Sequence, residues 1–561
     1  MSKQHPVHDL ADRFVDGFAA LSPMAATYAG IDGHDHRWGD LGPDGLAAEE
    51  ALLRRTRLQI EQLPPAEDPD DALAMRVIAD HLDPILEAYD HDDPLRDLGH
   101  IASTMPEMRD LLQLHDLTSE HGRDTARQRL ATLPEALEGW RQRLQLGIER
   151  GVVAARRQVR SIVGQLRDAV AEDGGIAQVA RGLADAEPEH ADRIADHLTD
   201  ARDRAERIAA WLEDVYLEVA AEEDAVGPER YHRALRGLVG TDLDLEETEA
   251  WAWTELASLL DRLRTVATRI DPDIEPREVL ELLRTDPNRA AASPERFREL
   301  MQERQTIALE ALAGEHFDVP DGIRRIDVRI APPGGAIGAY YISPSEDLSR
   351  PGSIWWSLGD RRTIPLFEEV STAYHEGFPG HHLQIGVQTT LADRLTRAHR
   401  MLIWNPGYGE GWALYAETLM DELGFLERPE YEIGYLTSSI LRVLRVVIDI
   451  GLHLERPIPD DAPLAPGRPW SFEHAVDALT DLAGLDRDYA VSEVTRYLGW
   501  PGQAISYAVG QREILRLREE RRAREGAAFD LRRFHADVLG SGPVGLAHLR
   551  ELVLEPDRKP G

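Results

Sequence analysis

The 561 residues include 101 acidic and 63 basic side chains, which gives a formal net charge of −38. Such a surface repels nucleic acid phosphates and anionic lipids, so we expect neither nucleic acid nor membrane as a partner. The absence of cysteine excludes disulfides, thiol nucleophiles and thiolate metal ligands. Lys3 and Lys559 are the only lysines, which argues against Schiff-base and P-loop chemistry. Because no signal peptide or bilayer-spanning apolar run is evident, the sequence predicts a cytoplasmic protein.

Residues 1–310 have the pattern of successive helices. The segment Thr132-Leu-Pro-Glu135 resembles a capping box with proline in the first turn, which predicts a helix start there. Residues 201–219 and 246–270 show similar helical spacing, and Ser293 precedes another predicted start. After the start predicted at Thr132, apolar residues recur every three or four positions: Leu133, Leu137, Trp140, Leu144 and Ile148. With no chemical motif in this region, we interpret its large apolar residues as core.

Strand-like alternation appears between about residues 317 and 360. Residues 323–330 alternate, and 339–342 and 353–358 are two further short strand candidates. Helices resume at Pro365. These patterns predict a mainly α fold, a large helical protein with a cleft and a small antiparallel β-sheet preceding the metal-binding helix described next. We expect a helical N-terminal region, 1–310, and a mixed catalytic region, 311–561, to form one integrated body.

The segment His375-Glu376-Gly-Phe-Pro-Gly-His381-His382 resembles a zinc-peptidase motif with altered spacing. In the usual motif two histidines four residues apart share a helix face, and a glutamate beside the first acts on water. Here the fourth position is Pro379, which has no ligand atom. The site therefore requires an interruption at Pro379-Gly380, where a two-residue bulge would bring His381 to the second ligand position. His382 remains an alternative ligand.

A second group of residues offers a third ligand. Glu410 and Glu417 are seven residues apart in a predicted helix, so both carboxylates lie on the same side, two turns apart. A glutamate from a downstream helix is a common third zinc ligand, and the other carboxylate could hold a ligating histidine through its free ring nitrogen. The spacing alone leaves the choice between the two open.

These motifs resemble a bacterial family known as domain of unknown function 885, whose members are thought to be zinc-dependent peptidases. The resemblance rests on ordered blocks in the second half of the chain: 375–384, 410–417, 445–453, 496–507 and 529–535. More distantly, the layout is similar to that of the helical gluzincins, which include oligopeptidases, thermostable carboxypeptidases and angiotensin-converting enzyme. That similarity implies a mostly helical protein with a deep cleft, a short sheet before the metal helix and a glutamate as third ligand.

We therefore hypothesise that His375, His381 and Glu410 bind Zn²⁺ and that Glu376 is the general base of a metallopeptidase acting on short peptides. Tyr507 is the first candidate for the oxyanion donor, ahead of two residues earlier in the same block: Tyr497 and Gln503. Asp449 and His453 could support a ligand or form a structural pair. Residues 353–358 could align a substrate by strand addition. The alternatives are a zinc hydrolase of non-peptide amides or esters and a catalytically silent helical binding protein, and the oligomeric state stays open.

Overall fold

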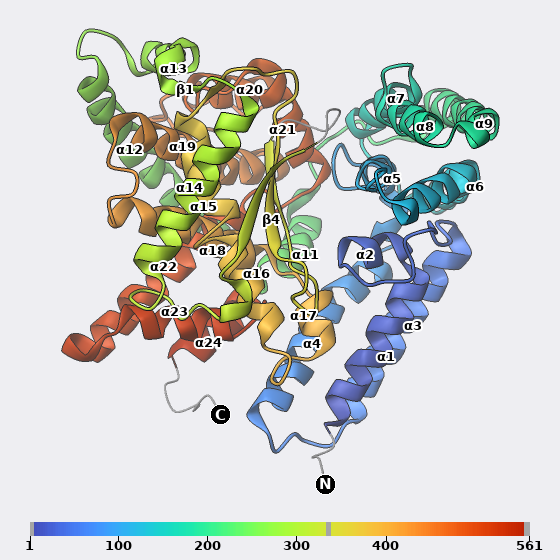
Figure 1. Cartoon of the computed structure of the whole chain (residues 1–561), viewed down its shortest axis with the longest axis horizontal. Helices are drawn as coiled ribbons and strands as arrows, with labels where there is room; N and C mark the ends of the chain where they lie inside the picture. The colour runs from blue at the N-terminus through green and yellow to red at the C-terminus, as the bar shows by residue number, and fades with distance from the viewer. Residues whose placement is uncertain (1–4, 332–337, 555–561) are drawn as a thin grey trace. The chain divides into compact units, whose positions relative to one another are not determined.

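A computed structural model describes residues 5–331 and 338–554 (Figure 1). Helices account for 69% of the chain and the sheets are small, which confirms the predicted mainly α fold class. None of the helices in the described ranges is both long and apolar enough to cross a bilayer.

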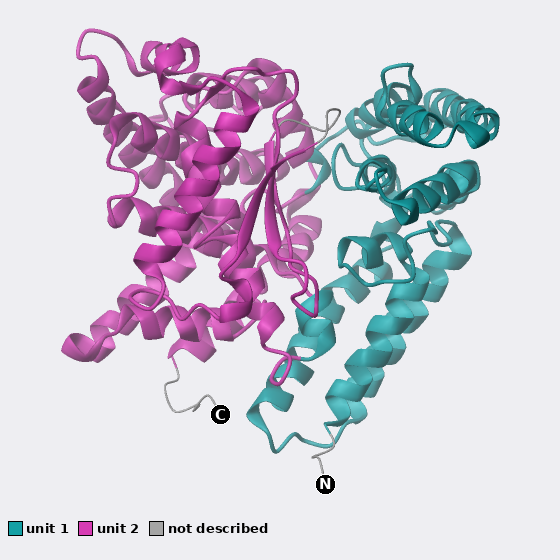
Figure 2. Ribbon diagram, viewed as in Figure 1, with its two compact units in different colours: residues 1–224, 396–402, 498–500 teal, residues 225–395, 403–497, 501–561 magenta. Residues whose placement is uncertain are grey.

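The chain divides into two compact units (Figure 2). Unit 1 comprises 1–224, 396–402 and 498–500, and unit 2 comprises 225–395, 403–497 and 501–561. The division lies well before the boundary expected near residue 310. The physical reason for the earlier division is that helix α12 (Leu245–Ile270) packs along α19 (Pro429–His453). Although α12 precedes residue 310, it therefore buries its apolar face within unit 2. That the two regions form one body around a deep cleft stays a prediction.

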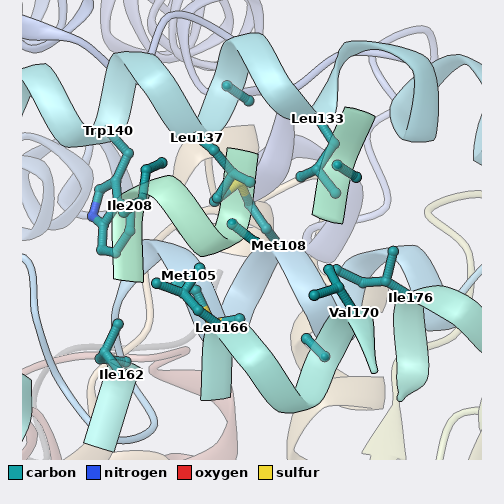
Figure 3. Packing of buried hydrophobic residues seen from close by; sticks show 14 of the residues in the cluster. Met105, Met108, Leu133, Leu137, Trp140, Ile162, Leu166, Val170, Ile176 and Ile208 are labelled. Atoms are coloured by element: carbon teal, nitrogen blue, oxygen red, sulfur yellow. The ribbon is translucent and has the colours of Figure 1, made fainter. Parts of the chain in front are cut away.

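Unit 1 is built from helices that pack around an apolar core. Its helices are α1 (Pro6–Leu21), α2 (Pro23–Tyr28), α3 (Pro43–Gln62), α4 (Pro69–Asp90), α5 (Thr104–Gln113), α6 (Glu120–Arg150), α7 (Arg156–Val170), α8 (Gly175–Ala186), α9 (Ala191–Trp211), α10 (Leu217–Val219) and α17 (Arg397–Met401). A π-helical turn over Leu212–Tyr216 joins α9 to α10. Figure 3 shows side chains of α5, α6, α7, α8 and α9 meeting in this core.

The helix predicted to begin at Thr132 begins twelve residues earlier, which corrects that expectation. Ser119 is the N-cap of α6 and accepts a hydrogen bond from Gly122 N. Pro134 lies inside the helix, and Thr132 Oγ1 donates to the carbonyl of Gln128 one turn back. An internal proline costs about 3 kcal/mol. The buried stripe that includes Trp140 offsets this cost, since each large apolar side chain contributes about 1.5–3 kcal/mol on burial.

Unit 2 combines helices with two small sheets. Its helices are α11 (Gly227–Val239), α12, α13 (Pro276–Thr285), α14 (Pro294–Leu312), α15 (Phe367–Glu376), α16 (His381–Thr390), α18 (Pro406–Glu422), α19, α20 (Phe472–Asp481), α21 (Arg487–Gly499, of which 498–499 belong to unit 1), α22 (Ser506–Glu525), α23 (Leu531–Gly540) and α24 (Leu546–Leu554). Its strands are β1 (Ala290–Ala291), β2 (Ile326–Ile330), β3 (Gly338–Ile342), β4 (Gly352–Ser357) and β5 (Ile364–Pro365). Ser293 caps α14 through the backbone N–H of Arg296, as predicted.

The three strands predicted before the metal helix are present, but their sheet is mixed rather than antiparallel. The strand order is β2-β4-β3, in which β4 pairs antiparallel with β3 and parallel with β2. In a simple antiparallel sheet consecutive strands are neighbours, whereas here β4 lies between the two earlier strands. Because both edges of β4 are already hydrogen-bonded, residues 353–358 cannot align a peptide by strand addition, and that expectation is wrong. Pro365 does not begin the metal helix either. It belongs to β5 and pairs with Ala290 of β1, and the helix, α15, begins at Phe367.

Candidate metal centre

The helix interruption expected at Pro379-Gly380 is present, in a different form from the predicted bulge. Helix α15 ends at Glu376, and a separate helix, α16, begins at His381. Backbone groups on both sides of the break are bonded to Gln305 of α14, which donates to Ala373 O and accepts from Phe378 N, both at 2.7 Å. Trp412 Nε1 donates to Pro379 O at 2.9 Å. The break is therefore a stable feature of the fold.

Glycine is required at the second residue of this break. A Cβ at Gly380 would lie 2.0 Å from the carbonyl oxygen of His375. The chain can thus fold back tightly against the end of α15 only where a side chain is missing. This close return brings His381 beside His375, with their ring centroids 4.9 Å apart and the rings nearly perpendicular.

Helix α18 supplies the two carboxylates. Asn405 caps it by accepting a hydrogen bond from Tyr408 N, and Pro406 occupies its first turn. A close glycine contact holds α18 against α22, since a Cβ at Gly411 would lie 2.5 Å from the carbonyl carbon of Gly510. Glu410 and Glu417 both point from α18 toward α15, where they approach the two different ring nitrogens of His375.

The structure brings together the three predicted ligands, His375, His381 and Glu410. Glu410 Oε2 lies 3.4 Å from His375 Nε2 and 3.5 Å from His381 Nε2. One ligand atom from each of the three residues lies within 4.8 Å of the others. Two ligand atoms held about 2.1 Å from a tetrahedral zinc ion are ~3.4 Å apart, so these separations fit zinc. Glu410 Oε2 is buried and accepts no hydrogen bond from the described residues, as expected for an oxygen reserved for a cation.

Glu417 orients His375 instead of sharing the ligand set. Its Oε1 lies 2.8 Å from His375 Nδ1, and its Oε2 accepts a hydrogen bond from Ser371. With Nδ1–H donating to this carboxylate, Nε2 of His375 faces Glu410 and is free to bind metal. The geometry thus distinguishes the two glutamates that sequence spacing left equivalent.

The electrostatics of the cluster suit a bound cation. Burial lowers the pKa of His375, but interactions with Glu410 and Glu417 outweigh it and raise the pKa to about 10. Burial opposes ionisation of Glu410, yet the two histidines hold the pKa of this carboxylate well below its usual range. Burial also opposes ionisation of Glu417, whose pKa is lowered by the charge of Arg442 and the bond to His375. The site therefore keeps its carboxylates charged inside the protein.

Glu376 and Trp404 lie near the candidate ligands and are less buried than the histidines. Glu376 is half-buried, and burial raises the pKa of its carboxyl against the opposing influence of His375 and His381. Trp404 is 39% exposed, and its ring centroid lies 6.0 Å from that of His381. A proton-accepting group and an aromatic surface thus lie beside the candidate ligands.

His382 has a different environment from its neighbour. Its Nε2 donates to Ile323 O at 2.7 Å, and its Nδ1 lies 3.0 Å from the hydroxyl of Tyr341. Both ring nitrogens are therefore engaged, and burial lowers the pKa of His382 to about 4. His382 is thus a neutral residue that ties α16 to β3 and to Ile323, and the structure favours His381 as the candidate ligand.

Tyr507, on the first turn of α22, lies close to the centre. Burial and the negative charge of Glu410 raise the pKa of Tyr507 to about 12. The other two candidates are bonded to the charged groups of α21: Tyr497 donates to Glu493 at 2.7 Å, and Gln503 accepts from Arg496 and also interacts with the Tyr507 hydroxyl. Their hydrogen bonds account for their burial, which leaves Tyr507 as the candidate oxyanion donor.

Asp449 and His453 form a structural pair. Asp449 Oδ2 accepts from Tyr231 at 2.7 Å and from Gly502 N at 2.9 Å. His453 Nε2 lies 3.0 Å from Tyr497 O, and 3.7 Å from Asp449 Oδ1. These contacts join α19 to α11 and to the end of α21, and neither residue contacts the histidines of the candidate centre.

Three supporting residues were missed from the sequence. Ser371 lies four residues before His375 on the same helix face, so its position was detectable. Arg442, whose charge acts on Glu417, precedes the recognised block 445–453 by one helical turn. Gln305 lies 73 residues before Phe378, and no local pattern links it to the break that it stabilises.

Comparisons with known proteins identify the family and the fold. A crystal structure described as the "putative lipoprotein" from Colwellia psychrerythraea is similar, with a TM-score of 0.82, 22% identity and 98% of each chain covered. A "putative lipoprotein of unknown function" from Shewanella oneidensis has a TM-score of 0.68 and 16% identity, over 98% of this chain and 100% of that one. No curated protein matches. Residues 23–553 match the family described as bacterial protein of unknown function (DUF885), and the chain belongs to that family.

Proposed function

We propose that this protein is a zinc-dependent hydrolase that cleaves amide bonds of short peptides. The main support is the buried group of His375, His381 and Glu410, whose ligand atoms are separated by distances that suit one tetrahedral zinc ion. The orientation of His375 by Glu417 adds to this support. Metal-binding histidines characteristically donate a hydrogen bond from their second ring N–H to a carboxylate or carbonyl oxygen.

A zinc ion held there would supply the Lewis acidity that activates water and polarises the scissile carbonyl. Glu376 accepts a proton from the attacking water at its carboxylate and passes it to the departing amine. The raised pKa of its half-buried carboxyl suits both steps. Tyr507 keeps its proton at neutral pH and donates a hydrogen bond to the developing oxyanion.

A substrate panel tests this function. Zinc-loaded protein is assayed with short peptides, with aryl esters and with small non-peptide amides, before and after treatment with a chelator. We expect peptide cleavage that is lost with the chelator and restored by added zinc. Absence of peptide cleavage in zinc-loaded protein, or cleavage that the chelator leaves unchanged, contradicts the proposal. Preferential turnover of esters or small amides supports the alternative zinc hydrolase.

The cytoplasmic location remains part of this proposal. Both similar structures carry the description of a lipoprotein, which favours a location outside the cytoplasm for those proteins. Fractionation of the native host separates the two cases: recovery in the membrane fraction would overturn the cytoplasmic assignment without affecting the proposed chemistry.

A further inference from the structure

Three arginines on two helices of unit 2 form ion pairs with only two carboxylates among the described residues, Glu417 and Glu493. We call Arg442 and Arg445 of α19 and Arg496 of α21 the arginine cluster. Arg445 Nη2 and Arg496 Nη2 both donate to the same oxygen, Glu493 Oε2, at 2.8 and 2.9 Å. One buried carboxylate therefore serves two buried guanidinium groups. This arrangement leaves an excess positive charge inside a protein whose formal net charge is −38.

Arg442 increases this excess. Its ion pair with Glu417 spans 3.9 Å, and its side chain is 15% exposed. Glu417 already accepts hydrogen bonds from His375 and Ser371. The Nε of Arg442 is buried and has no hydrogen-bond partner among the described residues. A buried N–H without an acceptor is costly, so an anion that reaches this partly exposed side chain would be stabilised there.

The arginine cluster adjoins the candidate metal centre through two contacts. Glu417 lies between Arg442 and His375 and interacts with both. The guanidinium of Arg445 lies 4.9 Å from the ring centroid of Tyr507. The charge of Glu410 in turn raises the pKa of Tyr507, which requires the two side chains to be close. An anion bound by the cluster would thus lie near the candidate centre.

We propose that Arg442 and the excess positive charge of the arginine cluster bind the free terminal carboxylate of the peptide substrate. This inference rests on the proposed hydrolase function and specifies its substrate class: peptides with an unblocked C-terminus, cleaved near that end. A carboxylate is the natural ligand because guanidinium groups bind planar carboxylates through paired hydrogen bonds. On a chain with a large negative charge, this local excess of positive charge also offsets the general repulsion of anionic substrates.

The test measures binding in a protein that does not turn over its ligand. In the Glu376→Gln background, zinc-loaded, isothermal titration compares N-acetyl-tetra-alanine with its C-terminal amide, which differ only in the terminal charge. We expect the acid to bind at least about tenfold more tightly than the amide, a typical effect of a charged hydrogen bond. Arg442→Met should reduce this ratio to near one, whereas Arg442→Lys should retain part of it. Metal content is measured in every variant, because Arg442 also lies near Glu417.

The outcomes separate this inference from the proposed function. Equal binding of acid and amide, an acid preference unchanged in Arg442→Met, or no binding of either peptide overturns the carboxylate site. If zinc-loaded wild type cleaves both peptides equally well, the hydrolase function stands while the carboxylate site fails. If wild type cleaves neither peptide yet the acid preference depends on Arg442, the carboxylate site stands and the proposed hydrolysis fails. An acid preference lost in Arg442→Met with metal content intact supports the proposal.

Discussion

The two units bury different kinds of side chain. Among the described residues of unit 1, Arg129 and His399 are the buried basic groups, and the core is otherwise made of apolar side chains and a few small polar ones (Figure 3). Unit 2 buries many more ionisable groups: His375, His381, His382, Glu417, Glu430, Glu432, Arg445, Asp449, His453, Glu493, Arg496, Arg518, Arg521 and His535. Burying charge is costly, and a fold needs little of it for stability alone. The difference indicates that unit 1 is built mainly by apolar packing and that unit 2 holds the buried ionisable groups, including the candidate metal centre.

The largest expected effect belongs to Glu376 in unit 2. Replacing it with glutamine preserves its size but removes the proton acceptor, and we expect peptide turnover to fall about 10²–10⁴-fold while zinc remains bound. Steady-state kinetics and metal analysis measure the two properties separately. Glu368→Gln is the matched control: it lies on the same helix and pairs with Arg284 at 2.8 Å. Turnover retained in Glu376→Gln would remove the assigned base.

A mutation in unit 1 should act on stability alone. Trp140 is fully buried, and its indole N–H donates to Asp97 O at 3.1 Å. Trp140→Ala leaves a cavity and an unpaired carbonyl, so we expect the free energy of unfolding of unit 1 to fall by about 3–5 kcal/mol. Denaturant unfolding followed by tryptophan fluorescence measures this change. Loss of zinc from the still-folded variant would show that the functional division between the units is wrong.

Buried histidines should make unit 2 sensitive to acid. Burial lowers the pKa of His535 from 6.5 to about 4, while Tyr415 Oη lies 2.7 Å from its Nε2. The unfolded chain therefore binds the proton first as the pH falls. The stabilisation is complete above pH 6.5 and is lost progressively toward pH 4, a change of about 3 kcal/mol.

The variant His535→Asn isolates this contribution. It removes the titrating ring, so its stability should vary less steeply than that of wild type between these pH values. Chemical denaturation at several pH values gives both curves. Parallel curves for the two proteins would show that His535 does not contribute to the acid sensitivity.

A smaller effect is expected from the carboxylate that orients His375. Glu417→Gln keeps a hydrogen-bonding group beside Nδ1 but removes its charge, and we expect zinc affinity to fall about 10–100-fold. Competition with a chromophoric chelator measures the affinity. Glu422→Gln, near the end of the same helix and paired with Arg518, is the control and should leave affinity unchanged. Equal affinities in the two variants would assign Glu417 a purely structural role.

Sequence reasoning located the candidate centre because its main features are local. The break at Pro379-Gly380 follows from the backbone properties of proline and glycine, and the seven-residue spacing of Glu410 and Glu417 follows from helix geometry. Local pattern could not assign the roles within these pairs. His381 and His382 differ only through partners far away in the sequence, such as Ile323 and Tyr341. The same limit explains the errors in the sheet, because nothing in the sequence of β4 shows that both its edges are paired.

The most direct test of the account is the metal content of three proteins: wild type, His381→Gln and His382→Gln. The substitutions are identical and adjacent, so they compare a candidate ligand with a neighbouring histidine whose ring nitrogens are both hydrogen-bonded. Each protein is purified, exposed to excess zinc, desalted and measured by mass spectrometry. We expect about one zinc per chain in wild type and His382→Gln, and a small fraction of that in His381→Gln. Wild type without zinc, or His381→Gln with as much zinc as wild type, would contradict the assignment of the metal centre.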